Sequence, residues 1–297
     1  MMDFIAKPFG ALMEFIYNNL AFHNYGVAII FFTLFVKIVL LPLTVKQQRS
    51  MERQQMINPE LEALQQKYKD DRKKLQEEQM NLYSKYNISP MSGCLPMLIQ
   101  LPLILVIYRI VRRPLTYIAG LASDKVKELV GIVNETWAKS RGWDGYEIQT
   151  NRFFMSSVSR ADQFKALTDG AQQINMKFLG IFDLGETPKW QFWKYGDQWK
   201  VYLPLLLIPI LAVATSYLQM FVSNRLNNMN QKKENGEQPA LAGMNGLLKI
   251  LPLMTFFIAF AVPAGLGFYW IVSNIFGIVQ TILLKKLFTI KKKEGSA

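Results

Sequence analysis

The chain has 297 residues, of which 51% are hydrophobic and 19% charged, with a net charge of +12. Soluble domains usually carry about 25% charged residues, so the composition favours an integral membrane protein, in which basic residues retain loops in the cytoplasm. A nucleic-acid-binding protein is the alternative explanation of the charge. The chain shows no RNA-binding aromatic motif and no zinc-finger spacing, so we expect no direct sequence-specific nucleic-acid binding.

The single cysteine, Cys94, excludes an intrachain disulfide, and His23 is the only histidine that could help it bind a metal. Structural metal sites need about four such ligands. We therefore expect no metal, no cofactor and no catalytic residues, and the protein is not expected to be an enzyme.

Residues 1–25 are expected to hold an external amphipathic helix that lies on the membrane surface. The apolar residues recur at helical spacing, namely Ile5, Phe9, Leu12, Ile16 and Leu20. Lys7 interrupts the apolar stretch, which is too short to span a bilayer. A signal anchor is the alternative interpretation.

Five later segments are long and apolar enough for membrane-spanning helices, each of which needs about 20 mostly apolar residues. They are residues 26–45, 93–113, 201–223, 247–265 and 266–284. The turn at Pro263, Ala264 and Gly265 makes the last two a tight hairpin. The predicted fold class is therefore an all-α integral membrane protein with five transmembrane helices.

The predicted topology follows from the odd number of spans and from the tail. Residues 285–297 contain five lysines, and short basic segments stay in the cytoplasm. The N-terminus and residues 114–200 then lie outside, while residues 46–92 and 224–246 lie inside. A multi-pass protein of the bacterial cytoplasmic (plasma) membrane is expected.

The segment 46–92 is predicted to form a cytoplasmic helical hairpin. Asn58, Pro59 and Glu60 are typical of a helix start, and Asp70 and Asp71 can start a second helix. The apolar stripes of the two helices are Leu61, Leu64 and Tyr68, and Leu75, Leu82 and Tyr86. A solvated spacer would not need such stripes, so they favour a docking surface.

The segment 114–200 is as long as a small domain. Two stripes suit amphipathic helices, the first being Val126, Leu129, Val133 and Trp137, and the second Phe164, Leu167, Ala171 and Ile174. Trp190, Trp193 and Trp199 precede the third span, where an aromatic belt belongs. The residue pattern assigns this segment no function.

A lysine lies inside the first span. Lys37 is slightly to the cytoplasmic side of the midplane, where a lysine costs ~3 kcal/mol or more. Three spans also carry polar stripes, which are Thr33, Lys37 and Thr44, then Thr215, Ser216, Gln219 and Ser223, then Trp270, Ser273, Asn274, Gly277, Gln280 and Thr281. Such stripes face one another or a water-filled space. Interhelical hydrogen bonding is one explanation, and Lys37 favours a functional groove.

Four segments of the chain resemble the YidC/Oxa/Alb family of membrane protein insertases. They are LFVKIVLLPLTVKQQRSM (34–51), NPELEALQQKYKDD (58–71), SGCLPMLIQLPL (92–103) and LPLMTFFIAFAVPAGLGFYWIVSNIFGIVQ (251–280). The resemblance implies a five-helix core, a cytoplasmic hairpin and a hydrophilic groove open to cytoplasm and lipid. It also implies a membrane protein insertase and chaperone.

The resemblance gives roles to individual groove residues. The family's groove charge is usually an arginine and matches Lys37, which keeps the charge but loses the bidentate fork. The family's threonine matches Thr33, its aromatic pair matches Tyr269 and Trp270, and its polar position on the third helix matches Gln219. Together with Asn274 and Gln280 of the last stripe, these residues form the predicted client-binding groove.

The resemblance also implies partners, which are nascent membrane proteins, the ribosome, the Sec translocon, the signal recognition particle pathway and the lipid bilayer. No cysteine precedes Cys94, so the N-terminal lipid anchor of many family members is not expected. Two other classes are alternatives. A small transporter or channel predicts repeated halves or paired ionisable residues, and a passive assembly scaffold would leave Lys37 dispensable.

Overall fold

The computed structural model describes residues 2–86, 95–136, 146–226, 250 and 252–294, and these are mostly helical. The chain forms two compact units. The first unit consists of Met1–Phe35, Leu103–Val213 and Met254–Ser273, and the second of Val36–Pro102, Ala214–Leu253 and Asn274–Ala297.

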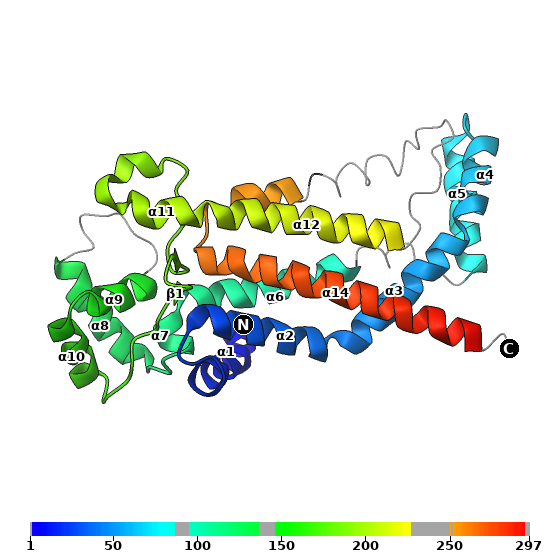
Figure 1. Cartoon of the computed structure of the whole chain (residues 1–297). Helices are drawn as coiled ribbons and strands as arrows, with labels where there is room; N and C mark the ends of the chain where they lie inside the picture. The colour runs from blue at the N-terminus through cyan, green and yellow to red at the C-terminus, as the bar shows by residue number, and fades with distance from the viewer. Residues whose placement is uncertain (1, 87–94, 137–145, 227–249, 251, 295–297) are drawn as a thin grey trace. The chain divides into compact units, whose positions relative to one another are not determined.

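The helices follow one another along almost the whole described chain (Figure 1). The first half contains α1 (Met2–Asn19), α2 (Tyr25–Val39), α3 (Leu41–Met56), α4 (Asn58–Lys67), α5 (Arg72–Lys85), α6 (Leu95–Arg112), α7 (Pro114–Tyr117) and α8 (Ser123–Thr136). The second half contains α9 (Tyr146–Met155), α10 (Val158–Leu167), the 3-10 helix η3 (Phe192–Gln198), α11 (Trp199–Leu205), α12 (Leu207–Leu226) and α14 (Ala264–Glu294).

Two helical stretches are long and apolar enough to cross a membrane, Phe192–Leu226 and Ala264–Leu287. A third is the pair Tyr25–Val39 and Leu41–Ser50, if these two bent helices form one span. This range of two to three applies to the described residues. Of the expected fourth span, residues 252–259 are helical, while 247–249 and 251 lie outside the described residues.

The structure divides the expected first span, 26–45, between α2 and α3, which meet at an angle of 58°. Pro42 is the second residue of α3. It has no N–H to donate back along the helix, and its ring crowds the carbonyl four residues earlier. The proline ring therefore accounts for the bend. Lys37 lies in the last turn of α2, just before the bend.

In the first unit, α1 buries a face to which the expected apolar stripe contributes Ile16, its one fully buried member among the described side chains. Ala6, Met13 and Tyr17 are buried, and a side chain at Gly10 would meet the ring of Tyr117. The expected face is only partly covered, and Leu20 is 47% exposed. The absence of a side chain at Gly10 permits this close packing against Tyr117 of α7.

The helices between α6 and η3 enclose a core of their own. It consists of Leu115, Val126, Leu129, Val133, Phe153, Phe154 and Phe164. Both expected stripes contribute to it, with Leu167 and Ala171 at its margin, while Trp137 lies outside the described residues. Ser157 caps α10 by accepting a hydrogen bond from the Arg160 N–H.

A short antiparallel β-hairpin also belongs to the first unit, which an all-α expectation did not include. Its strands are β1 (Lys177–Phe178) and β2 (Phe182–Asp183), with Lys177 opposite Asp183 and Phe178 opposite Phe182. Two residues per strand are too few for a period of two to be recognised in the sequence.

In the second unit, α4 and α5 pack against each other around Ile57, Leu61 and Leu82. Asp71 caps α5 by accepting a hydrogen bond from the Lys74 N–H, as its position predicted. The start of α4 differs from the expectation, because Ile57 precedes the helix and Asn58 already belongs to it. Ile57 is buried in this small core, and this packing fixes where the helix begins.

Candidate functional site

Lys37 lies in the second unit, near the end of α2, with its side chain half-buried. Among the described residues, none of the ion pairs includes Lys37. A cation in the apolar part of a membrane is costly and is generally kept for function. The position therefore supplies a positive charge close to the bend at Leu40.

Thr33 is one helical turn before Lys37 and belongs to the first unit. Its side chain is buried, and its hydroxyl donates a hydrogen bond of 2.6 Å to the Ile29 carbonyl of the same helix. The hydroxyl hydrogen is thus used within α2, as is common for threonine in helices.

Two of the predicted polar stripes meet in the second unit. The Asn274 amide of α14 donates hydrogen bonds to Thr215 Oγ1 at 3.1 Å and to Ser216 Oγ at 2.8 Å, both on α12. One turn further along, a Cβ at Gly277 would lie 3.1 Å from the Gln219 Cδ. The polar residues thus bring the two helices together, and the absence of a side chain at Gly277 makes room for Gln219.

The other predicted groove residues differ in burial. Tyr269 is 1% exposed, and Trp270 is half-buried, both in the first unit. Gln219 and Gln280 are half-buried in the second unit. The seven predicted residues therefore divide into Thr33, Tyr269 and Trp270 in the first unit, and Lys37, Gln219, Asn274 and Gln280 in the second.

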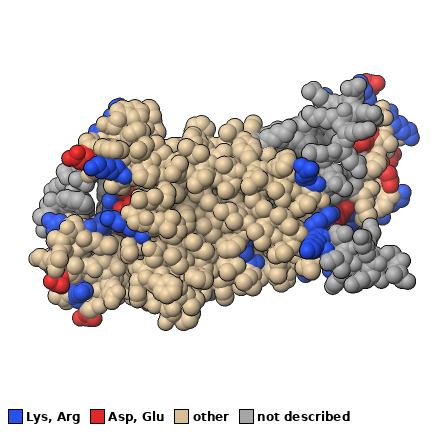
Figure 2. All heavy atoms as spheres, in the orientation of Figure 1, with Lys and Arg blue, Asp and Glu red and all other residues tan. Residues whose placement is uncertain are grey.

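The charges of the two units are distributed unevenly over the surface drawn in Figure 2. The surface over α12 is almost uncharged, whereas α4 and α5 carry charges of both signs. An uncharged helical surface suits a hydrocarbon environment and a mixed-charge surface suits water.

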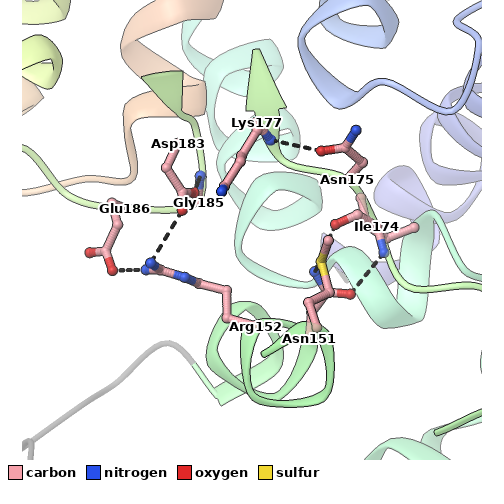
Figure 3. A network of polar contacts seen from close by, with 9 residues as sticks. Asn151, Arg152, Ile174, Asn175, Lys177, Asp183, Gly185 and Glu186 are labelled. Carbon is pink, nitrogen blue, oxygen red and sulfur yellow. Dashed lines mark hydrogen bonds and ion pairs between the residues drawn. The ribbon is translucent and has the colours of Figure 1, made fainter. Parts of the chain in front are cut away.

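A polar network that the sequence did not reveal holds residues 174–186, which we call the strap (Figure 3). The Asn151 carboxamide of α9 is fully buried and exchanges two hydrogen bonds of 2.8 Å with the backbone of Ile174. The neighbouring Arg152 pairs with Asp183 at 3.2 Å and with Glu186. Together these two residues of α9 fix both ends of the strap.

The strap in turn holds the first residues of two long helices. The Tyr25 N–H donates to the Asn175 carbonyl at 3.0 Å, at the start of α2. The N–H groups of Ala264 and Gly265 donate to the carbonyls of Glu186 and Leu184 at 2.7 Å, at the start of α14. Helix N-termini have unpaired N–H groups, and the strap accepts hydrogen bonds from these three within the first unit.

The strap also contacts α1, because the Asn175 N–H donates to the Tyr17 hydroxyl at 2.9 Å. The sequence contained a signal for this arrangement in the acidic residues of FDLGETP, which lie among apolar ones. Their partner, Arg152, is some thirty residues earlier, and no short-range pattern connects the two.

Glu147 is a buried ionisable residue of α9. Its carboxylate accepts hydrogen bonds from the Thr116 N–H at 2.9 Å and the Thr116 hydroxyl at 2.6 Å. Burial raises the pKa of this carboxyl, and the bonds from Thr116 offset part of the rise. Within the described chain, no group of three His, Cys, Asp or Glu side chains could hold a metal ion.

Together, the apolar helices and the polar stripes within them define an α-helical integral membrane protein. A family model described as 60Kd inner membrane protein matches residues 15–293. This chain belongs to that family, the YidC/Oxa/Alb family.

Relatives from bacteria and a plant match most of the chain. A protein of Clostridium tetani named membrane protein insertase YidC is 31% identical over 265 residues, 89% of this chain and 83% of that protein. One of the same name from Wolinella succinogenes is 28% identical over 297 residues, but the chain spans only 40% of its length. The chloroplastic ALBINO3-like protein 1 of Arabidopsis thaliana is 28% identical over 264 residues, 44% of its length.

Proposed function

We propose that the chain is a membrane protein insertase and chaperone that guides transmembrane segments of client proteins into the bilayer. The family match over residues 15–293, with relatives named membrane protein insertase, carries this proposal. The half-buried Lys37 near the end of α2 supports a specific mechanism.

The mechanism begins with the cost of moving a polar client flank through hydrocarbon. A hydrophilic groove open to the cytoplasm and the lipid shortens this low-dielectric path. We assign its walls to Thr33, Gln219, Tyr269, Trp270, Asn274 and Gln280, and its charge to Lys37. The cation attracts an acidic client flank, because opposite charges interact more strongly where the dielectric constant is low.

The client's apolar helix can then leave the groove into lipid. Half-exposed apolar side chains lie on the parts of α12 and α14 that belong to the second unit, namely Leu218 and Phe221 on α12 and Ile275 and Val279 on α14. The bonds from Asn274 hold these two helices together beside the path. No covalent step is needed, since the free energy comes from burying the client's apolar residues in lipid.

The proposed topology has five spans, namely residues 26–45, 93–113, 201–223, 247–265 and 266–284. It places the helix of residues 1–25 at the outer membrane surface, residues 114–200 outside, and residues 46–92, 224–246 and 285–297 in the cytoplasm. The basic tail supports this orientation. The bend at Leu40 would lie toward the cytoplasmic end of the first span.

The hairpin of α4 and α5 is proposed to recruit clients and their delivery partners, which are the ribosome, the Sec translocon and the signal recognition particle pathway. Its exposed Met80, on α5, supports a docking surface. Deleting residues 58–86 should leave a membrane-embedded core that inserts clients slowly. Insertion at the normal rate would contradict the recruitment role.

Reconstitution tests the function itself. The purified chain is incorporated into liposomes and given a short single-span client, and protease protection of the translocated flank measures insertion. An insertase raises the protected fraction above that of empty liposomes. A transporter, channel or passive scaffold leaves it unchanged.

A further inference from the structure

The tip of the β1–β2 hairpin displays two apolar side chains, and the first of them belongs to a residue with an unfavourable backbone conformation. Leu179 and Ile181 are 71% and 58% exposed. Leu179 has φ +52° and the next residue, Gly180, has φ +74°. Glycine adopts such angles readily, whereas a leucine there is strained by its Cβ. A glycine or asparagine would suit an exposed turn in water better.

The base of this hairpin is held firmly. Arg152 pairs with Asp183 in β2, and Asn151 fixes Ile174, three residues before β1 (Figure 3). Arg152 also counters the negative charge of Asp183, while Lys177 in β1 remains exposed. The hairpin therefore presents an apolar tip and one exposed cation from a fixed base.

The hairpin adjoins the first residues of helices that are candidate membrane spans, all within the first unit. The Phe178 ring lies 4.8 Å from that of Phe268 in α14, measured between centroids. A Cβ at Gly26, the second residue of α2, would lie 2.6 Å from the Phe178 Cγ. Strand β2 also packs against α11, within the stretch Phe192–Leu226. The tip is thus continuous with a surface formed by three helix ends.

We propose that the β1–β2 hairpin is a lipid anchor, whose Leu179 and Ile181 enter the interfacial layer of the leaflet at the Ala264 end of α14. In the topology proposed above, this is the outer leaflet. Lys177 would contact lipid phosphates, and Leu179 and Ile181 would lie among the glycerol and upper acyl groups. Lipid is the occupant that suits this position, because the hairpin packs on helix ends that must meet the headgroup region.

Two tryptophans that follow the strap in the sequence support the same boundary. Trp190 and Trp193 are 60% and 59% exposed and pack edge to face, with centroids 5.8 Å apart. They lie at the beginning of the stretch Phe192–Leu226 or just before it. Exposed tryptophans at the end of a membrane helix are typical of the membrane–water interface.

The test uses a fluorescent probe on single cysteines in the full chain, with Cys94→Ser to remove the native thiol. Leu179→Cys carries the probe at the tip, and Val158→Cys is the matched control, since Val158 is 80% exposed in the same unit. The chain is reconstituted in phosphatidylcholine–phosphatidylglycerol liposomes containing a phospholipid with a nitroxide near its headgroup.

A lipid anchor predicts blue-shifted emission at position 179, strong quenching by the nitroxide lipid and weak quenching by aqueous iodide. The probe at position 158 should show the opposite pattern. Equal iodide quenching at both positions would overturn the proposal. It would also be overturned if position 179 became shielded only when a client or another protein was added, because the tip would then be a protein-docking surface.

A second variant separates anchoring from folding. Leu179→Gly suits the backbone and removes the apolar side chain, and the probe is placed at Ile181→Cys. The proposal predicts a loss of lipid quenching at position 181, with an unchanged or higher melting temperature. Unchanged lipid quenching, or a lower melting temperature, would show that Leu179 does not anchor the hairpin in lipid.

Discussion

The Asn274 amide donates a hydrogen bond of 2.8 Å to Ser216 Oγ and thereby joins α14 to α12. The polar stripes had two explanations, interhelical hydrogen bonding and a functional groove. This contact supports the first explanation at Asn274, and it does not account for the charge of Lys37. In the proposed groove, Asn274 is expected to act by holding α12 and α14 together, whereas Lys37 is expected to act directly on clients.

Replacing Asn274 with alanine should therefore reduce the stability of the protein more than its rate of client insertion. Hydrogen bonds between membrane helices contribute about 0.6–1.7 kcal/mol, so the melting temperature in detergent should fall by a few degrees. Insertion per folded molecule should change little. A Gln280→Ala variant is the control, and its melting temperature should change less. Equal losses of stability would argue against a special role for the Asn274 bonds.

Arg152→Ala should destabilise the first unit clearly. Arg152 is 26% exposed, and the side chains of Asp183 and Glu186 are only 12% and 7% exposed, so its removal leaves two carboxylates poorly compensated. We expect a loss of about 2 kcal/mol, below the range for fully buried pairs because Arg152 is partly solvated. Thermal unfolding in detergent measures the change.

Arg160→Ala provides the comparison for Arg152. Arg160 is half-buried, donates a hydrogen bond to the Ser156 hydroxyl and lies 4.2 Å from the centroid of the Phe153 ring. Its removal should cost at most about 1 kcal/mol. If Arg152→Ala and Arg160→Ala lowered the stability equally, the strap would not depend on the Arg152 ion pairs.

Glu147 predicts a dependence of stability on pH. Its pKa in the folded state lies above the ordinary value of 4.5, so the folded protein binds more protons than the unfolded one between these two pKa values. Stability should fall as the pH rises through this window and stay lower above it. Glu147→Gln should flatten this dependence and raise the melting temperature at neutral pH.

Melting temperatures of both proteins from acidic to neutral pH check the prediction for Glu147. The glutamine can still form both hydrogen bonds with Thr116. Its amide oxygen can accept from the Thr116 N–H, and its NH₂ group can donate to the Thr116 hydroxyl. A lower stability of Glu147→Gln at neutral pH would mean that the ionised carboxylate is favourable in its site, contrary to the predicted sign.

The topology can be tested with exposed single cysteines in the Cys94→Ser background. Met80→Cys on α5 and Val158→Cys on α10 occupy side chains that are 52% and 80% exposed. In intact cells, an impermeant thiol reagent should label position 158 and spare position 80, and permeabilised cells should show labelling at both. Labelling of position 80 in intact cells would reverse the proposed orientation.

Sequence periodicity predicted the parts of the fold that depend on neighbours in the chain. The stripes of Val126, Leu129 and Val133 and of Phe164 indicated helices whose apolar faces do meet in one core. The stripes of α4 and α5 likewise indicated two amphipathic helices, and Leu61 and Leu82 of these stripes share a small core. In both cases the helical period alone determines which side chains share a face.

The strap could not be predicted in this way. Its bonds come from Tyr17, Asn151 and Ala264, which are far from residues 174–186 in sequence. The break at Leu40 was missed for another reason. Prolines are tolerated in membrane helices when neighbours compensate, so Pro42 alone did not distinguish a continuous span from a bent one.

Some residues of the candidate site could be predicted from the sequence. A lysine within an apolar span identified Lys37, and polar residues at helical spacing identified Asn274 and its partners Thr215 and Ser216. Which stripe contacts which depends on the rotation of each helix about its axis. Single-helix periodicity does not define that rotation, so the close approach of Gln219 to Gly277 could not be foreseen.

The central claim is that the charge of Lys37 acts on clients. Lys37→Arg keeps the charge and should retain insertion, whereas Lys37→Ala and Lys37→Glu should reduce it. The reduction should be greatest for clients with acidic translocated flanks, because these are the flanks that a cation attracts. Since a cation in the membrane is costly, Lys37→Ala should leave the melting temperature unchanged or raise it.

The most direct measurement compares two single-span clients that differ only in an acidic flank, inserted into liposomes by the wild-type chain and by Lys37→Ala. Insertion per folded molecule and melting temperature are determined on the same preparations. We predict a selective loss of insertion for the acidic client with no loss of stability. A variant that melts early yet inserts both clients normally per folded molecule would contradict the mechanism and make Lys37 a packing residue.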